Sequence, residues 1–287
     1  MPRVLRLRRG RRMRVIAIVQ AFNEERFIAR CIEHLREQGV GVYLIDDAST
    51  DNTLAIAERY LGRGVVGIEQ LPPHDVHDWQ EICRRKELLA DRLDADWLMH
   101  HDADEIRVSP AHGQSLARAL QEIDEAGYNA VNFQEFTFVP TLEEPDHDHP
   151  RFECTMRSYY AFAPFHPHRL NAFKRQDGPV ELAWSGGHQV RFEGLRAAPA
   201  SLYMRHYQFL SREHAIRKYV EHRPFAAHTV AAGWHSFRLR LHADMIRLPR
   251  SQSLLSYRGD HRLDGSAPRR SHVLDDLVAG LEPGAAA

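Results

Sequence analysis

An uninterrupted apolar run of β-prone residues occupies positions 15–19 (VIAIV), and the polar segment 20–24 (QAFNE) comes directly after it. A run of this kind is typical of a parallel strand that is buried on both faces. A second run, residues 42–45 (VYLI), begins about 30 residues further on, the usual length of a strand–helix–strand unit. The two runs together predict an α/β protein with a parallel sheet.

The same alternation of strand and helix continues to about residue 100. Apolar runs at 65–68 and 97–99 predict two further strands, and apolar residues at helical spacing predict a helix after each of the first three strands. Crossover helices between such strands favour an open, doubly wound, mostly parallel sheet. The expected helix N-caps are Asn23, then Ser49 or Asp51, then Asp78.

The second half of the chain is less regular. A helix is expected over 115–126, and residues 130–139 predict a strand with a bulge, because the apolar positions change parity within it. A short helix is expected from Ser211, and apolar residues at helical spacing predict another between Trp234 and Leu248. We therefore predict a basic arm over 1–12, one domain over 13–250 with a C-terminal helical cap, and a flexible Arg-, Ser-, Gly- and Ala-rich tail over 251–287.

Composition excludes several classes of protein. The 287 residues carry 38 Lys and Arg against 39 Asp and Glu, a net charge of −1, which argues against a general nucleic-acid binder. Cys31, Cys83 and Cys154 form no CxxC pair, so a reducing cytoplasm is the expected compartment. No apolar run near the N-terminus is long enough for a signal peptide core or a membrane span. The basic arm either contacts anionic lipid at the inner membrane face or is an irregular start ahead of Met13.

Carboxylates follow three of the four predicted strands. In open α/β sheets ligands bind at the carboxyl ends of the strands, so these side chains should meet at one edge. Asp102 and Asp104 lie two residues apart after the fourth strand, and in an extended chain both would face one hard cation. Such a cation keeps coordination positions open for the oxygens of a diphosphate. The alternative is a solvated turn with no ligand.

Three segments in this order, 15–25 (VIAIVQAFNEE), 44–53 (LIDDASTDNT) and 96–105 (DWLMHHDADE), resemble the family 2 glycosyltransferases of the GT-A fold. The resemblance covers about residues 13–110 and is strongest to the subgroup with a DADE ending. It implies a nucleotide-sugar-binding half over 13–110, an acceptor-side half over 111–250 and a GT-A-like sheet. By this resemblance Asp47 binds the nucleotide base or ribose, and Ala21, Asn23 and Glu24 form the wall beside the base. Arg85, in preference to Arg84 or Lys86, lies near the phosphates. Asp102 contacts the ribose or sugar and also the metal, and Asp104 holds Mn²⁺ or Mg²⁺.

The resemblance also implies inversion at the anomeric carbon, with a carboxylate as the base. No Glu-Asp pair precedes a helix in the second half, so Glu181 is the candidate base, ahead of Asp177 and Glu193, because it precedes the Gly-rich loop 184–188 (WSGGH). His206 is a candidate further metal ligand. Trp184 and His188 of that loop are candidates for the acceptor side, with phosphate as the alternative for His188.

We therefore expect an enzyme, a metal-dependent inverting glycosyltransferase. Its donor would be a nucleoside-diphosphate sugar, and its acceptor a hydroxyl of a glycan, a lipid-linked intermediate or a small molecule in cell-wall or polysaccharide biosynthesis. No nucleic-acid partner and at most peripheral membrane contact are expected. The alternatives are a metal-dependent hydrolase, a nucleotidyltransferase, and a non-catalytic sugar-nucleotide-binding module.

Overall fold

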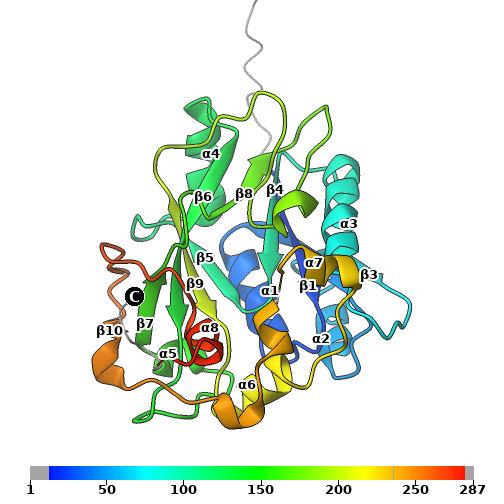
Figure 1. Ribbon diagram of the computed structural model, residues 1–287. Helices are drawn as coiled ribbons and strands as arrows, with labels where there is room; N and C mark the ends of the chain where they lie inside the picture. The colour runs from blue at the N-terminus through cyan, green and yellow to red at the C-terminus, as the bar shows by residue number, and fades with distance from the viewer. Residues whose placement is uncertain (1–12, 235, 282–287) are drawn as a thin grey trace, which may run out of the picture.

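A mixed sheet with the order β10-β7-β6-β8-β4-β1-β2-β3 forms the centre of the molecule (Figure 1). The structure is a computed structural model that describes residues 13–234 and 236–281, so the predicted basic arm over 1–12 lies outside the described residues. The strands in chain order are β1 (Val15–Ala21), β2 (Val40–Asp46), β3 (Val65–Gln70), β4 (Trp97–Asp102), β5 (Glu105–Val108), β6 (Ala130–Phe138), β7 (Ser158–Phe162), β8 (Arg169–Lys174), β9 (Leu202–Tyr207) and β10 (Leu255–Ser256).

The N-terminal half of the sheet is parallel. β1 pairs with β2 on one side and with β4 on the other, and β2 pairs with β3, all in parallel. Val15, Ala17 and Val19 of β1 pack into one hydrophobic cluster, whereas Ile16 and Ile18 pack into a second cluster on the opposite face. Burial on both faces explains the unbroken apolar run, and the predicted α/β class with an open, doubly wound sheet is confirmed.

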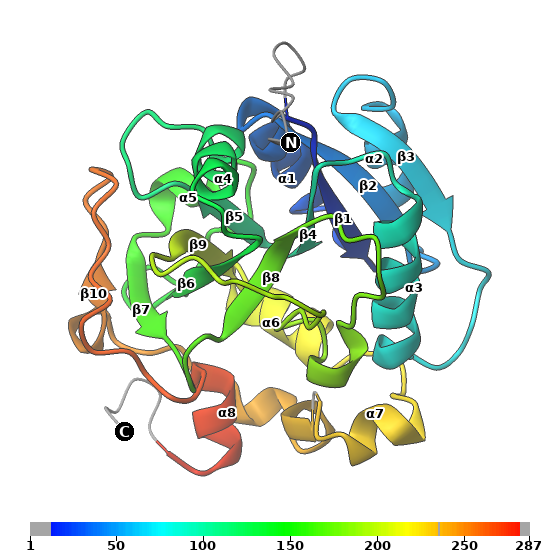
Figure 2. The same ribbon diagram turned by 90° about the horizontal axis from the view of Figure 1, so that it is seen from above.

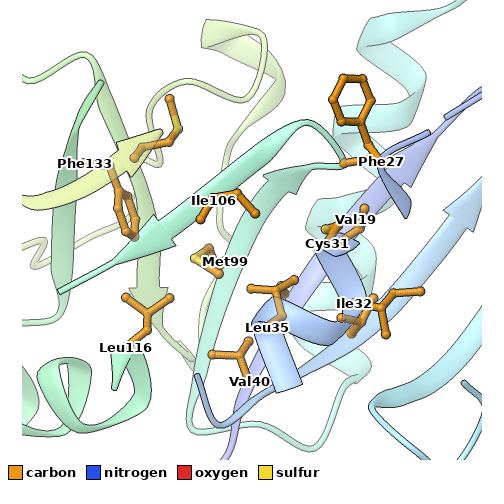
Figure 3. Close-up of a cluster of buried hydrophobic side chains, with 14 of the residues drawn as sticks. Val19, Phe27, Cys31, Ile32, Leu35, Val40, Met99, Ile106, Leu116 and Phe133 are labelled. Atoms are coloured by element: carbon orange, nitrogen blue, oxygen red, sulfur yellow. The ribbon is translucent and has the colours of Figure 1, made fainter. Parts of the chain in front are cut away.

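Helices cover both faces of this parallel half. Figure 3 shows Cys31, Ile32 and Leu35 of α1 (Ile28–Glu37) in the same core cluster as Val19 of β1 and Met99 of β4. On the other face, α3 (Trp79–Arg92) contributes Leu89 and Ala90 to the second cluster. The remaining helices are α2 (Thr53–Glu58), α4 (Leu116–Glu125), α5 (Phe152–Thr155), α6 (Arg212–Tyr219), α7 (Ala227–Ala231) and α8 (Val273–Val278).

Two of the predicted helix starts differ in their outcome. The Asp78 side chain accepts a hydrogen bond from the backbone N–H of Glu81 and caps α3, as predicted. Asn23 does not cap α1, which begins later, at Ile28. Its φ is 56°, and its side-chain oxygen accepts a hydrogen bond from the backbone N–H of Thr50, 2.8 Å away. Asn tolerates the left-handed region, so Asn23 turns the chain after β1 and ties it to the segment after β2.

The second half of the sheet is largely antiparallel. β8 pairs antiparallel with both β4 and β6, and β6 pairs antiparallel with β7. β9 lies parallel to β6 and antiparallel to β5. The register between β6 and β8 shifts between Val131 and Asn132, which lies earlier in the strand than the predicted change of parity between Phe133 and Phe136.

The predicted helix between Trp234 and Leu248 is wrong. The described residues of this segment form only short 3₁₀ turns at Ser236–Leu239 and Ala243–Met245. Leu241, Ile246 and Leu248 are nevertheless buried, in a cluster with residues of α6 and α8. Their spacing serves the packing of an irregular chain against these two helices, and it does not require a continuous helix.

Residues 251–281 also differ from the predicted flexible tail. β10 pairs with β7, and the two strands lie side by side in Figure 2. α8 buries Val273, Leu274 and Leu277. The Asp275 side chain accepts a hydrogen bond from the backbone N–H of His272 at the start of α8. A few apolar residues on one helix face are enough to dock α8, and the polar composition around them concealed that signal. Within the described part of the chain, no helix has the length and apolar character needed to cross a membrane.

Candidate functional site

A cavity of about 720 Å³ lies at the carboxyl ends of β1 and β4. One wall comes from the residues after these strands, and the other comes from β9, α6, the segment that follows α6, and the start of α8. Ligands bind at this edge in open α/β sheets. The predicted site residues that line the cavity are Asn23, Glu24, Asp102, Asp104, His188 and His206.

Asp104 is the centre of a buried ion cluster in this cavity. Its Oδ2 lies 2.9 Å from Nζ of Lys218 on α6 and 3.4 Å from Nε2 of His206 on β9. The same Lys218 ammonium lies 2.9 Å from Oε1 of Glu24. Burial alone would raise the pKa of Asp104, but Lys218 and His206 outweigh it and hold the pKa well below its usual range. Burial raises the pKa of Glu24 to about 7, against the opposing effect of Lys218.

Glu135 on β6 supports this cluster from behind. His206 Nδ1 lies 2.6 Å from Oε1 of Glu135, and Arg169 on β8 donates from Nε to Oε2 at 2.8 Å. Burial alone would lower the pKa of His206, but Asp104 and Glu135 together raise it to about 10. His206 is therefore an imidazolium that bridges two carboxylates.

Several buried polar atoms around the cavity have no hydrogen-bond partner. The acceptors are Oε2 of Glu24 and Oδ1 of Asp102, and the donors are Nε of Arg223 and Nε of Arg238. Buried polar groups without a partner are rare in folded proteins because each costs about 1–3 kcal/mol. Carboxylate oxygens match sugar hydroxyls and guanidinium N–H groups match phosphate oxygens, so the cavity offers both chemistries.

Asp47 lies fully buried after β2, beside the cavity. Arg223 donates to its Oδ2 at 2.5 Å, and Nδ1 of His77 lies 3.2 Å from the same oxygen. The Arg223 guanidinium also stacks over the ring of Phe22, 3.7 Å from its centroid. The Asp47 carboxylate, which is the predicted nucleotide contact, therefore already pairs with Arg223 from the segment after α6. Ala21 is buried at the end of β1, directly before Phe22.

The structure does not bring the other predicted residues into the cavity. Arg85 pairs with Glu69 at the surface, and Trp184 is 45% exposed, with Arg191 stacked on it. Glu181 pairs with the same Arg191, half exposed. Among the residues that the structure describes, none of these three side chains lines the cavity. The arrangement therefore does not support phosphate binding by Arg85, acceptor binding by Trp184 or a catalytic base at Glu181.

Lys86, and not Arg85, is the cation that lies beside the residues directly before the DADE segment (102–105). Its side chain is fully buried, with Nζ 3.2 Å from Nδ1 of His100 and 3.4 Å from the carbonyl oxygen of His101. Glu105, the last residue of the DADE segment, is buried and pairs with Arg107 inside the protein. Lys86 and Glu105 therefore hold the backbone next to Asp102, through the carbonyl oxygen of His101 and the N–H of Asp102.

Lys218, Arg223 and Glu135 are the important residues that the sequence analysis missed. Each lies far along the chain from the motifs it contacts, so no local spacing marks it. One signal was available for Lys218. It follows His214 by one helical turn, on a face of α6 that also carries the buried Ala215 and Tyr219, and a lysine on such a face needs a buried partner.

The donor set does not fit a divalent ion as these side chains are arranged. Among the described residues, no group of three or more His, Cys, Asp or Glu side chains is placed to hold a metal ion. Asp104 is already shared by an ammonium and an imidazolium. A protonated His206 has no lone pair for a metal, so the predicted ligand role of His206 is not supported by this arrangement.

A cavity at the carboxyl edge of the parallel strands is the usual place of a ligand site in the class of open α/β sheet proteins. Residues 16–70 match the model of the family described as glycosyl transferase family 2. This segment holds all of β1 except Val15, together with β2, β3, Asn23, Glu24 and Asp47.

Part of the chain is similar to a curated glycosyltransferase. The lipopolysaccharide core biosynthesis glycosyltransferase LpsC of Rhizobium meliloti (strain 1021) is 28% identical over 110 residues. The match covers 38% of this chain and 38% of LpsC, so the chain spans well under half of that relative. Among solved structures, S. aureus TarS 1-349 in complex with UDP-GlcNAc is 14% identical with a TM-score of 0.42, over 72% of this chain and 62% of that chain. LgtC in complex with donor and acceptor sugar analogues reaches a TM-score of 0.26 over 45% of this chain and 47% of that chain.

Proposed function

We propose that the protein is an inverting glycosyltransferase that moves a sugar from a nucleoside-diphosphate sugar to a hydroxyl acceptor. The observation that carries the proposal is a single cavity whose lining residues include Glu24 and Asp102, each with a buried, unpartnered carboxylate oxygen, and Arg223 and Arg238, each with a buried, unpartnered Nε–H. The family 2 match over residues 16–70 supports the same activity. The name of LpsC favours a glycan acceptor over a small molecule.

In this mechanism the acceptor oxygen attacks the anomeric carbon while the bond to the diphosphate breaks on the opposite side. Arg223 and Arg238 neutralise the charge that develops on the leaving phosphate. The carboxylates of Glu24 and Asp102 accept hydrogen bonds from the sugar hydroxyls and so orient the ring. The acceptor proton passes to a carboxylate on the cavity wall.

Asp275 is our candidate for that base in place of Glu181. It lines the cavity at the start of α8, where the neighbouring His272 ring lies 6.1 Å from the His206 ring. Burial raises the pKa of Asp275, which favours acceptance of a proton. We expect Asp275→Asn to lower kcat about 100-fold or more with little change in donor affinity. Glu181→Gln is the matched control and should keep its rate, so loss of rate in the control alone would restore Glu181 as the base.

Binding of UDP, GDP and dTDP, followed by calorimetry, tests the function itself, and the anomeric configuration of the product tests inversion. A flat response to every nucleoside diphosphate would contradict the proposal. Hydrolysis of a phosphoester without sugar transfer would favour the hydrolase, and binding without turnover would favour the non-catalytic module. The DADE subgroup and the cytoplasmic location stay predictions, and the two cations beside Asp104 argue against the predicted need for Mn²⁺ or Mg²⁺.

A further inference from the structure

We propose that Lys218 is a resident cation of the donor site, which occupies Asp104 in place of a divalent ion, so that the protein binds a nucleoside diphosphate without added metal. The inference rests on the proposed function, because it concerns how the same cavity holds the diphosphate. It explains why the carboxylates of Glu24 and Asp104 can lie close together in a buried cavity.

Lys218 is held firmly in place. Its Nζ lies 2.9 Å from both Oε1 of Glu24 and Oδ2 of Asp104, and its side chain is only 15% exposed. The ring of Phe27 lies 5.0 Å from the ammonium. α6 begins at Ser211, whose side chain accepts a hydrogen bond from the backbone N–H of His214, so the helix that carries Lys218 is capped.

The ammonium still has a donor for a ligand. It carries three N–H groups, and the two carboxylates accept two of them, which leaves one for a phosphate oxygen. Arg238 adds a second cation at the same cavity, with its buried Nε unpartnered. A diphosphate that accepted from both side chains would gain charge-assisted hydrogen bonds, and these are the strong ones.

A divalent ion would have to compete with Lys218. Because Nζ lies 2.9 Å from Asp104 Oδ2, an ion bound to that oxygen at about 2.1 Å would lie within about 5 Å of the ammonium. Two positive charges at that distance repel each other strongly in a buried site. Metal at Asp104 therefore requires that Lys218 move away, and Lys218 in place makes the metal dispensable.

Lys218→Met tests the inference, because it removes the charge and keeps a long side chain. UDP, GDP or dTDP binding is measured by calorimetry in EDTA and in Mn²⁺, for wild type, Lys218→Met and Lys218→Arg. In EDTA we expect wild type and Lys218→Arg to bind with similar affinity, and Lys218→Met to bind about 10- to 100-fold more weakly, the usual effect of losing a hydrogen bond to a charged group. Lys174→Met, which removes an exposed ion pair with Asp124 outside the cavity, is the matched control and should bind as wild type does.

Binding of Mn²⁺ alone, followed by electron paramagnetic resonance, gives a second readout that needs no nucleotide. We expect Lys218→Met to bind Mn²⁺ at least about tenfold more tightly than wild type, because Asp104 and Glu24 then no longer share an ammonium, and this also shows that the variant is folded. Wild-type binding that is abolished by EDTA and restored by Mn²⁺ would overturn the inference and leave the proposed function standing. Absence of any nucleoside diphosphate binding by wild type, with or without Mn²⁺, would overturn both.

Discussion

The carboxylate of Glu135 balances the positive charges of two residues that line the cavity, Arg169 and His206. It accepts hydrogen bonds from Arg169 and His206, and the imidazole of His168 lies 3.7 Å from its Oε2. Burial would raise its pKa, but Arg169 and His206 hold that pKa well below its usual range. Without the Glu135 carboxylate, the buried Arg169 guanidinium and the buried His206 imidazolium would have too little opposite charge beside them. Glu135 is therefore required to keep these two cations buried in the cavity wall.

We expect Glu135→Gln to lower the free energy of unfolding by about 3–5 kcal/mol, the usual cost of breaking a buried ion pair from one side. Urea denaturation followed by circular dichroism measures the change. The control is Glu181→Gln, since Glu181 is half exposed and pairs with an exposed arginine. This control should stay within about 0.5 kcal/mol of wild type. Equal effects of the two substitutions would contradict the claim that the buried ion pairs of Glu135 stabilise the cavity wall.

At the scale of elements, the loop over residues 185–188 connects the cavity to the centre of the sheet. Gly187 has a φ of 85°, and a Cβ at this position would lie 2.4 Å from Cε1 of His100 on β4. Its carbonyl oxygen accepts a hydrogen bond from Asn171 on β8. The loop thus needs glycine for two reasons at once, the left-handed backbone and the close approach to β4.

We expect Gly187→Ala to be clearly more destabilising than Gly194→Ala. Gly194 also has a positive φ, 74°, but a Cβ there meets nothing within 4 Å, so it measures the backbone strain alone. That strain should cost about 1 kcal/mol, and the clash at Gly187 should add about 1–3 kcal/mol. Thermal unfolding of the two variants checks this, and equal melting temperatures would mean that His100 moves aside freely.

Elements differ in how well the sequence predicted them. The strands of the parallel half could be predicted because burial on both faces leaves an unbroken apolar run, as in β1. Asp102 and Asp104 could be placed in the cavity for the same reason, since they follow such a strand. The partners Lys218 and Glu135 could not, because they reach Asp104 and His206 only through tertiary packing of α6 and β6. Residues 234–248 were predicted as a helix that the structure does not contain, because their apolar spacing serves the packing of an irregular segment.

At the scale of the whole molecule, many histidines are buried in the neutral form. Burial lowers the pKa of His34 to about 4, and it also holds the pKa values of His100 and His101 well below the ordinary value. In the unfolded chain each would titrate at its ordinary pKa, about 6.5. A group with a lowered pKa in the folded state stabilises the protein above about pH 6.5 and loses that contribution as the pH falls toward the folded-state pKa.

The fold should therefore lose stability between pH 6.5 and pH 4. For His34 alone the expected loss from pH 7 to pH 5 is about 2 kcal/mol. His34→Gln should make the free energy of unfolding less dependent on pH in this range, since glutamine can still donate to the carbonyl oxygen of Arg107 as His34 does. His112→Gln is the control because His112 is exposed, and urea denaturation at several pH values measures both. An unchanged pH dependence in His34→Gln would contradict the argument.

The chain has only three lysines, and they lie in three different surroundings. Lys86 is fully buried, the side chain of Lys218 is 15% exposed in the cavity, and the side chain of Lys174 is 46% exposed at the end of β8. Acylating reagents that attack amines therefore find one accessible lysine side chain on the outside of the folded protein. A dye, a bead or a surface can be attached at Lys174, at the end of the sheet away from the cavity. Acylation of Lys218, read by mass spectrometry, then requires that its amine leave the ion pairs with Glu24 and Asp104 and reach solvent.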